Sequence, residues 1–268
     1  MFDNVCKYLA ETFSADYAAW LLGKPFTLTT LSPKELSLEP IRADALILEQ
    51  SDNLVLHLEF QTEPDETMGF RMLDYRVRVH RRFPHKTMHQ VVIYLKQTAS
   101  DLVYQDTFEL GETSHRYRVI RLWEESPEPF LSNPGLLPLA VLTQSQNPTE
   151  RLREVALSLD RIGDKTVKAN LTTATAVFGG LLVKPALIKT ILRSELMKES
   201  AVYQEILQEG EQRGLLKGKL EGKLEGKLEG KLEVAQKLLE RGLPMADIIS
   251  LTGLSVDALK GISNLHDS

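Results

Sequence analysis

A pair of short apolar segments, 41–48 and 54–61, restricts the fold of this chain more than any other feature of its sequence. Residues 54–61 alternate between large apolar side chains and a second set, which consists of Val55, His57, Glu59 and Gln61. Because successive side chains of a strand point to opposite faces, the alternation predicts a strand with one apolar and one largely polar face. The link between the two segments is short and polar, so they should pair as an antiparallel hairpin.

The hairpin should bring two acidic residues together, because Asp44 lies in the first segment and Glu59 in the second. Neighbouring carboxylates repel one another unless a cation lies between them, and oxygen ligands suit a hard ion such as Mg²⁺. We therefore expect Asp44 and Glu59 to bind Mg²⁺, with Mn²⁺ as a substitute, and the carbonyl of Phe60 to add a third oxygen. The alternative is that both acids lie on an open, solvated face.

A magnesium ion in this position would suit phosphodiester hydrolysis. The ion can hold the scissile phosphate, lower the pKa of a bound water, and offset charge on the attacking and leaving oxygens. Gln61 should point the same way as Glu59 and, being neutral, would orient the attacking water by hydrogen bonding. The catalytic residues expected from the sequence are thus Asp44, Glu59 and Gln61.

Basic residues gather in the segment that follows the hairpin. Residues 66–83 read as a helix that ends before Pro84, with apolar positions at Phe70, Leu73 and Val77. Between positions 71 and 86, five arginines and one lysine accompany a single acid. Because lysine and arginine provide most contacts to a phosphate backbone, this helix is the expected DNA contact. The residues expected to contact DNA are Arg71, Tyr75, Arg78 and Arg82. A solvated or salt-bridged helix face is the alternative.

The rest of the sequence predicts an α/β (α+β) fold, in which a mixed sheet is flanked by helices. Helical patterns occupy 3–22, 150–161, 166–182 and 185–198. Further strands are expected at 90–96 and in a hairpin formed by 102–110 and 115–123. The proline-rich stretch 124–148 is expected to form loops with short helical turns.

This order of segments resembles the PD-(D/E)XK nuclease superfamily, and more closely the recombination-promoting nuclease and transposase-like family of bacteria. The resemblance rests on the opening helix 3–22, Arg42-Ala43-Asp44, the strand His57-Leu58-Glu59-Phe60-Gln61, the helix 71–76, the strand 91–95, the glycine-rich tetrads and the short helical tail. It implies a restriction-endonuclease-like fold and magnesium-dependent endonuclease action on DNA, in events linked to recombination or mobile elements.

In this resemblance, Asp44, Glu59 and Gln61 match the family's Asp and Glu-x-Gln positions. Ala43 stands where the superfamily has proline, and Gln61 stands where it has lysine, although glutamine is common in this branch. The departure leaves the water-activating group open. The superfamily often adds a glutamate from the first helix, for which Glu11 is the candidate here; the alternative is that Glu11 lies on a wet helix face.

Composition restricts the class of protein further. A formal charge of −5 argues against a generally basic surface, so contact with nucleic acid must be local. The single cysteine, Cys6, permits no intramolecular disulfide and fits a reducing cytoplasm. No apolar run is long enough to cross a bilayer, and no P-loop, dinucleotide fingerprint or zinc-site spacing occurs.

The tetrad Gly-Lys-Leu-Glu occurs four times without interruption between Gly218 and Glu233. On a helix, a period of four advances each column by about 40° per repeat, so the leucines form a slowly winding stripe. Like charges at i,i+4 are unfavourable, and each interior glycine costs about 1 kcal/mol relative to alanine, so a lone helix is weak. Two interpretations stay open. One is a homodimeric stalk that winds right-handed with lysines facing glutamates, and the other is a flexible tether.

Residues 235–261 read as short helices around the turn Thr252-Gly253-Leu254, with Ser255 as an N-cap. This tail resembles half of a helix-turn-helix motif, but its second helix offers only Lys260 as a basic group, which favours packing or dimerisation over base readout.

We therefore expect a nuclease-like domain with a helical cap at 1–200, a repeat helix or linker at 201–234, and a tail at 235–268. The expected activity is that of a cytoplasmic, magnesium-dependent DNA endonuclease. The alternatives are a catalytically silent DNA-binding or scaffolding protein that dimerises through the repeat, and a nuclease that cleaves RNA.

Overall fold

The computed structural model describes residues 2–26, 28–30, 46–192, 200–255 and 258. The chain divides into two compact units, Met1–Ile206 and Leu207–Ser268. The division falls close to the boundary expected after residue 200. The second unit takes in both the repeat and the tail, which the sequence analysis separates.

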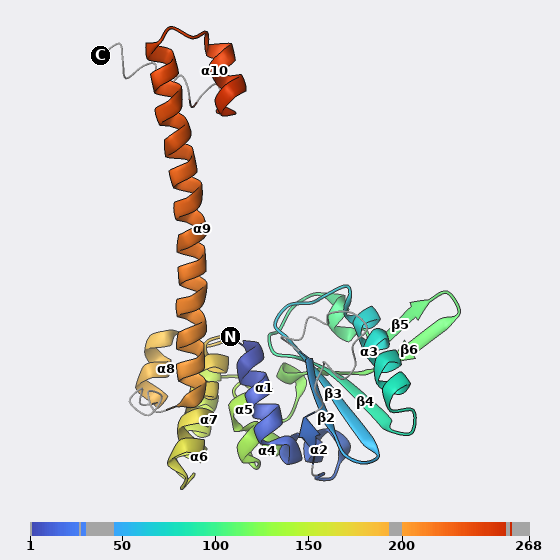
Figure 1. Cartoon of the computed structure of the whole chain (residues 1–268). Coiled ribbons are helices and arrows are strands. Elements are labelled where there is room, and N and C mark those ends of the chain that lie inside the picture. The colour runs from blue at the N-terminus through green and yellow to red at the C-terminus, as the bar shows by residue number, and fades with distance from the viewer. Residues whose placement is uncertain (1, 27, 31–45, 193–199, 256–257, 259–268) are drawn as a thin grey trace. The chain divides into compact units, whose positions relative to one another are not determined.

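The first unit contains a mixed sheet, shown in Figure 1, whose described strands follow the order β1-β2-β3-β4-β7. These strands are β1 (Thr29–Thr30), β2 (Leu46–Gln50), β3 (Leu54–Gln61), β4 (Thr87–Tyr94) and β7 (Arg118–Arg121). The pairs β1–β2 and β2–β3 are antiparallel, while β3–β4 and β4–β7 are parallel. The expected mixed α/β class is therefore confirmed.

The predicted hairpin is confirmed over its described residues. β2 and β3 pair antiparallel with Leu46 opposite Glu59 and Gln50 opposite Val55. The connecting turn closes with a hydrogen bond from the Ser51 amide to the Leu54 carbonyl at 2.9 Å. β3 spans the predicted residues 54–61, because its alternating pattern matches the strand period.

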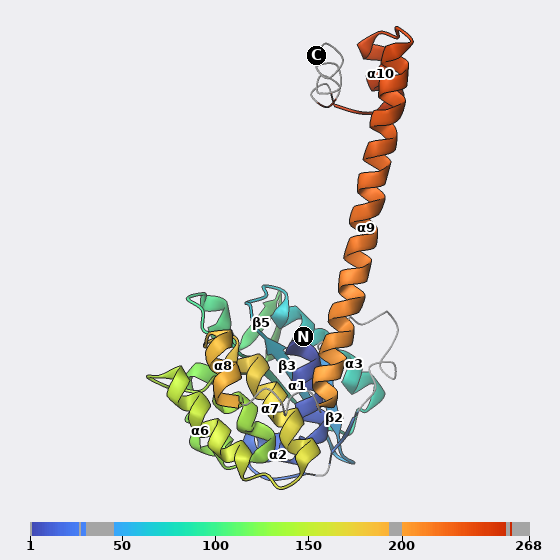
Figure 2. The same cartoon turned by 90° about the vertical axis from the view of Figure 1, so that its left-hand side faces the viewer.

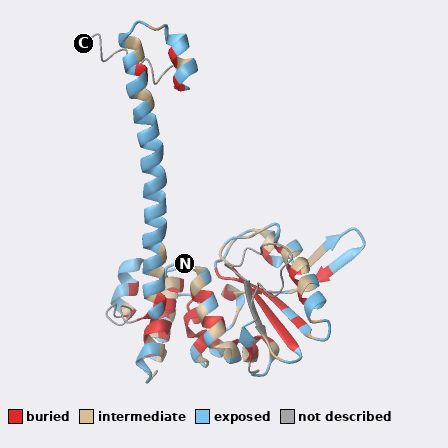
Figure 3. Ribbon diagram, in the orientation of Figure 1, coloured by how far each residue is buried: buried red, intermediate tan, exposed pale blue. Residues whose placement is uncertain are grey.

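One face of the sheet builds the main hydrophobic core. Leu54, Leu56, Leu58 and Phe60 point into it from β3, and Val91 and Ile93 join them from β4. The core is completed by helices from both ends of the unit: α1 (Phe2–Thr12), α2 (Ser14–Leu22), α4 (Glu128–Leu131), α5 (Leu137–Ala140), α6 (Pro148–Asp160), α7 (Lys165–Gly179) and α8 (Pro185–Leu192). Burial concentrates on these elements in Figure 3.

The predicted helix 3–22 is two helices instead of one. The break lies at Phe13, whose φ of −116° and ψ of 37° are not helical. α2 then ends at Leu22, the end of the predicted range, and Gly23 after it adopts a left-handed φ of 77°.

The opposite face of the sheet is covered by α3 (Met68–Arg82), which follows the predicted helix 66–83 closely. Its buried residues are Met68, Met72, Tyr75 and Val79. Phe70 and Val77, whose helical spacing helped to identify this helix, are 54% and 47% exposed. The four buried residues pack against the sheet, and they lie on a different face of the helix from Phe70 and Val77.

The segment expected to form a hairpin from 102–110 and 115–123 divides differently. Its described elements are a short 3-10 turn, η2 (Asp101–Tyr104), the hairpin strands β5 (Thr107–Leu110) and β6 (Thr113–Arg116), and β7. β5 and β6 pair around Gly111, whose φ is 58°. Two further turns, η3 (Leu122–Glu124) and η4 (Pro134–Leu136), fall in or beside the proline-rich stretch. The chain therefore leaves the small hairpin at Tyr117 and returns to the main sheet.

The described part of the second unit is mainly helical, and its long helix begins within the first unit. α9 (Ala201–Glu240) contains the whole repeat and runs without a break in Figure 2, and α10 (Met245–Thr252) follows it. The repeat residues are helical, and the homodimeric stalk stays a prediction. Ala235 and Ile248 form a small core with Leu254. Gly253 ends α10 with a φ of 63°, and the Ser255 hydroxyl accepts a hydrogen bond from the Ala258 amide at 3.2 Å, as an N-cap does.

Among the described residues, no helix combines the length and the apolar character that a membrane span requires.

Candidate functional site

Glu59 lies between the sheet and α3, and its side chain is 0% exposed. Strand alternation puts it on the same face as His57, which is also fully buried. Val92 of β4 lies directly beside Glu59 in the parallel register, and the face is largely buried. A carboxylate in such surroundings loses its hydration and needs hydrogen-bond donors or an opposite charge from the protein.

Arg71 of α3 provides that opposite charge. One terminal nitrogen of its guanidinium donates to Oε2 of Glu59 at 2.9 Å, and the other donates to Oδ2 of Asp65 at 3.1 Å. The guanidinium therefore bridges two carboxylates. Burial disfavours the charged form of Arg71, but Glu59 and the other neighbouring groups outweigh it and raise the pKa of Arg71 overall.

Asp65 lies just before α3, two residues ahead of Thr67, the N-cap residue of this helix. Its Oδ1 accepts hydrogen bonds from the amide and the hydroxyl of Thr67, at 2.8 and 2.7 Å. Partial burial acts to raise the pKa of Asp65, yet the Thr67 hydrogen bonds and Arg71 lower it overall. The sequence reasoning missed Asp65, although an Asp two residues before a Thr at a helix start is a local capping pattern that could have identified it.

His57 connects Glu59 to a second strand. The side-chain amide nitrogen of Gln90 lies 3.0 Å from Nδ1 of His57 and donates to the carbonyl of Met72 at 2.7 Å. Because an amide nitrogen only donates, Nδ1 must be the acceptor, which places the imidazole proton on Nε2. Nε2 then donates to Oε1 of Glu59, and the two atoms are 3.4 Å apart. Both Glu59 oxygens therefore face donors from this chain.

His57 and Gln90 were also missed in the sequence reasoning. The alternation in 54–61 placed His57 on the face of Glu59, which is the signal that could have identified it. Oε1 of Gln90 is buried with no hydrogen-bond partner among the described residues.

The remaining predicted site residues differ in what the structure says of them. Gln61 ends β3 and is half-buried, and its carbonyl accepts a hydrogen bond from the Leu95 amide at 2.8 Å. Asp44 lies outside the described residues, as do Arg42 and Ala43. Glu11 is half-buried on α1, where it lies 4.0 Å from Lys7 one turn away. Glu11 therefore has a local partner on its own helix.

Three of the four expected DNA contacts already have partners in this chain: Arg71, as described above, and also Tyr75 and Arg78. Tyr75 is 6% exposed, and its ring packs edge-on against His57 at a centroid distance of 5.0 Å. Burial and the nearby Glu59 raise its pKa. Arg78 donates from Nε to both carboxylate oxygens of Asp74, at 3.0 and 2.9 Å. The position of Tyr75 on α3 turns its side chain inward, toward His57.

Arg81 and Arg82 keep the expected exposure at the end of α3. The guanidinium of Arg82 lies 5.5 Å from the ring centre of Phe83, and His80 and His85 nearby are exposed as well. The cations that remain open to a polyanion therefore lie at the C-terminal end of the helix, while Arg71 at its N-terminal end faces Glu59.

Within the part of the chain that the structure describes, no group of three or more His, Cys, Asp or Glu side chains is arranged to hold a metal ion. Glu59 and Asp65 offer the oxygen ligands that a hard cation prefers, but Arg71 holds one oxygen of each. The donor chemistry fits Mg²⁺, provided that the guanidinium moves away from Glu59.

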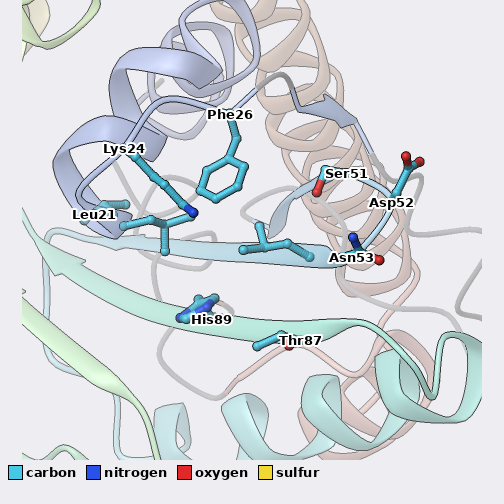
Figure 4. Close-up of a pocket in the computed structure, with 10 residues that line it drawn as sticks. Leu21, Lys24, Phe26, Ser51, Asp52, Asn53, Thr87 and His89 are labelled. Carbon is cyan, nitrogen blue, oxygen red and sulfur yellow. The ribbon is translucent and has the colours of Figure 1, made fainter.

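A separate cavity of about 680 Å³ lies at the other end of β3, where Leu54 begins the strand. Figure 4 shows Lys24 and Phe26 reaching over β3, with His89 on the neighbouring strand. Burial and the charge of Arg76 lower the pKa of His89. Since none of the predicted site residues lines this cavity, it is not part of the Glu59 site.

No family model, curated protein or solved structure matches this chain.

Proposed function

We propose that this chain is a magnesium-dependent DNA endonuclease with a restriction-endonuclease-like fold, acting in recombination or on mobile elements. The buried carboxylate of Glu59, on the central strand of a mixed sheet, carries the proposal. The order of helix, hairpin, helix and parallel strand is also the order on which the resemblance to this nuclease class rests.

The burial of Glu59 supports a functional role because it is unfavourable for stability. Removing a carboxylate and its partner from water costs several kcal/mol per ion, and apolar residues in place of a buried pair are often neutral or stabilising. Apart from Glu59, the fully buried residues of β3 include one other polar side chain, His57. A chain selected for stability alone would carry an apolar residue at position 59.

In the proposal, Asp44 and Glu59 hold Mg²⁺, and Gln61 orients the water at the end of the strand. Bound Mg²⁺ would supply a water of lowered pKa and positive charge opposite the phosphate. Asp44 precedes Leu46 by two residues in the sequence, and Leu46 lies opposite Glu59 in the hairpin. His57 holds Oε1 of Glu59 through Nε2 and so fixes the orientation of the carboxylate.

For Glu59 to bind Mg²⁺ in this proposal, Arg71 must release its contact with the Glu59 carboxylate. Its side chain is 28% exposed, whereas Glu59 is fully buried, so the guanidinium can turn toward solvent. Its second contact, to Asp65, would anchor it near the site after it leaves Glu59. We propose that Arg71 then contacts a phosphate oxygen, for which the planar guanidinium is well suited.

DNA would approach the face of α3, because Arg81 and Arg82 are exposed at the end of this helix. Lysine and arginine contacts to phosphate release counterions, so binding should weaken steeply with salt. Arg78 is proposed as a weaker contributor, since Asp74 already neutralises it.

A catalytically silent DNA-binding or scaffolding protein is the second candidate. The observation that favours it is the ion pair between Arg71 and Glu59, because a guanidinium on a carboxylate competes with a metal ion for the same oxygen. In this case Arg71 and Glu59 only join α3 to the sheet.

Plasmid cleavage separates the two candidates. The purified full chain should nick or linearise plasmid DNA with Mg²⁺ or Mn²⁺ and not with EDTA, and Glu59→Gln and Asp44→Asn should each abolish cutting. Glu63→Gln, which changes a 75% exposed carboxylate that pairs with Lys96, is the matched control and should cut normally. Each variant must melt like the folded parent. A well-folded parent that cuts neither DNA nor RNA with either ion would favour the silent candidate.

A further inference from the structure

The repeat in α9 carries charged side chains that cannot pair with one another on their own helix. From any lysine of a tetrad, the glutamates lie two and six residues ahead, or two and six behind. Only residues three or four apart are neighbours on a helix surface, so these spacings exclude lysine–glutamate pairs within the repeat. The ion pairs described along this helix accordingly reach outside the tetrads: Arg213 to Glu209, Lys217 to Glu221, and Lys237 to Glu233.

A row of leucines runs between the two rows of charge. Leu216, Leu220, Leu224 and Leu228 recur every four residues, and their exposed fractions range from 67% to 50%. At 100° per residue, lysines fall about 100° to one side of this row and glutamates about 100° to the other, while glycines lie on the far side. The leucine row is thus an apolar ridge with a positive and a negative flank.

The same row is covered where it reaches the end of the repeat. Leu232, its next member, packs against the small core formed by Ala235, Ile248 and Leu254. α10 contributes Ile248 to that core, so a helix is the kind of element that this ridge accepts. The four leucines before it have no such cover among the described residues.

We propose that the leucine row of a second copy of this chain covers these leucines, with the two helices running in the same N-to-C direction (a parallel pair). Symmetry decides the direction. In a parallel pair related by a two-fold axis along the helices, the lysine flank of one copy meets the glutamate flank of the other. In an antiparallel pair, lysines would meet lysines and glutamates would meet glutamates, which is unfavourable.

The spacing of the leucines also sets the geometry of the contact. Rows of residues four apart incline by about 26° to the helix axis, and two such rows interdigitate when the helices cross at about −50°. The copies therefore cross at the repeat instead of coiling along its full length. A contact of a few leucines is smaller than the roughly 800 Å² per partner of a standard stable interface, so self-association should be weak and depend on concentration.

Sedimentation velocity of the full chain over a range of concentrations tests the proposal. The dimer fraction should rise with concentration, and Leu220→Ala with Leu224→Ala should weaken association about tenfold or more. Gly222→Ala with Gly226→Ala is the matched control, because these glycines lie away from the ridge and have nothing within 4 Å of an added Cβ. This control should associate at least as well as the parent. A chain that stays monomeric, or a leucine variant that associates normally, overturns the proposal.

Charge variants test the flanks. Changing Lys219, Lys223 and Lys227 to Glu should abolish self-association, as should changing Glu221, Glu225 and Glu229 to Lys. A mixture of the two variant chains should form a heterodimer. If each variant still associates with itself as the parent does, the flanks do not face one another.

Disulfide formation tests the direction. Leu220→Cys should crosslink to itself under mild oxidation if the helices are parallel. An antiparallel pair centred on Leu224 would crosslink only when Leu220→Cys is mixed with Leu228→Cys, and that result would overturn the parallel arrangement. The parent chain is the control, because its one cysteine, Cys6, is buried.

Discussion

At the scale of single residues, the contact that matters most to the proposed site is the guanidinium of Arg71, which two carboxylates share. Glu59 comes from the sheet, Asp65 from the loop before α3, and Arg71 from the helix itself. Their contacts join segments that could otherwise move independently. The same three residues would respond first to a metal ion or a phosphate, so they connect the stability of the fold to the proposed activity.

Replacing Arg71 alone should lower the free energy of unfolding more than replacing Arg71 and Glu59 together. Arg71→Met leaves the Glu59 carboxylate buried without its partner; such losses cost roughly 3 to 5 kcal/mol, and the partial exposure of Arg71 should reduce this to about 2 to 4 kcal/mol. The double variant with Glu59→Gln should recover part of the loss. Urea unfolding of the two single variants and the double variant measures the coupling, and Arg82→Met, on the exposed end of α3, should change stability by less than about 0.5 kcal/mol. Additive effects would mean that the two side chains do not interact.

Tyr94 should make the fold sensitive to alkali. Burial raises the pKa of Tyr94 to about 12, with smaller contributions from Tyr117 and Asp65. The unfolded value is about 10, so the folded state resists deprotonation, and stability should fall as pH rises from about 10 to 12. The shift corresponds to about 2 to 3 kcal/mol. Tyr94→Phe should lose this part of the pH dependence, measured as the difference in unfolding free energy from the parent at pH 8 and pH 11. Equal slopes for both proteins would contradict the assignment.

At the scale of elements, α3 is the piece that completes the site. It covers the polar face of β3, carries Arg71, and supports the β5–β6 hairpin through an edge contact between Phe70 and Phe108 at 6.0 Å. Gly69 permits this close approach, since a Cβ there would lie 2.9 Å from Cβ of Phe108. The exposed ring of Phe70 is thus explained in part by the hairpin that lies beside it.

Two glycine substitutions should therefore have opposite effects. Gly69→Ala gains about 1 kcal/mol of helix propensity but forces an overpacked contact that costs about 1 to 3 kcal/mol, so it should be neutral to destabilising. Gly222→Ala meets nothing within 4 Å and should stabilise its helix by about 1 kcal/mol. Circular dichroism and thermal unfolding of both variants measure the difference. Similar stabilisation by both would show that the hairpin does not rest on α3.

At the scale of the whole molecule, the two units differ in how they are stabilised. The first unit has a large apolar core built on the sheet, whereas the core of the second unit contains three buried residues, Ala235, Ile248 and Leu254, in the part of the chain that the structure describes. Stability follows the amount of buried apolar surface. The units should therefore unfold separately.

Thermal unfolding followed by circular dichroism at 222 nm should show two transitions. The first should belong to the second unit, and Gly222→Ala with Gly226→Ala should shift only that transition upward, by several degrees. The Arg71→Met variant is the complementary control, since it should lower only the later transition. A single transition that responds to both sets of changes would indicate that the units unfold together.

Local pattern was enough to predict the elements whose cause is local. The alternation in 54–61 predicted β3, and Pro84 predicted where α3 ends. The tetrads left a helix and a flexible tether open, and the structure is helical there. The pattern also placed His57 and Glu59 on one face. It did not predict the break at Phe13 or the buried stripe of α3, because both depend on what packs against the helix.

The sequence by itself determined that a polar pair would interrupt an apolar strand, and that an arginine-rich helix would follow. Only the tertiary structure decided that Arg71 turns inward to Glu59 and that Asp65 accepts a second hydrogen bond from the same guanidinium. It also decided that the amide of Gln90 donates to Nδ1 of His57 and so places the imidazole proton on Nε2. The physical reason is that a buried charge takes its partner from whatever lies nearest in space, and those neighbours are separated along the chain by 6 to 33 residues.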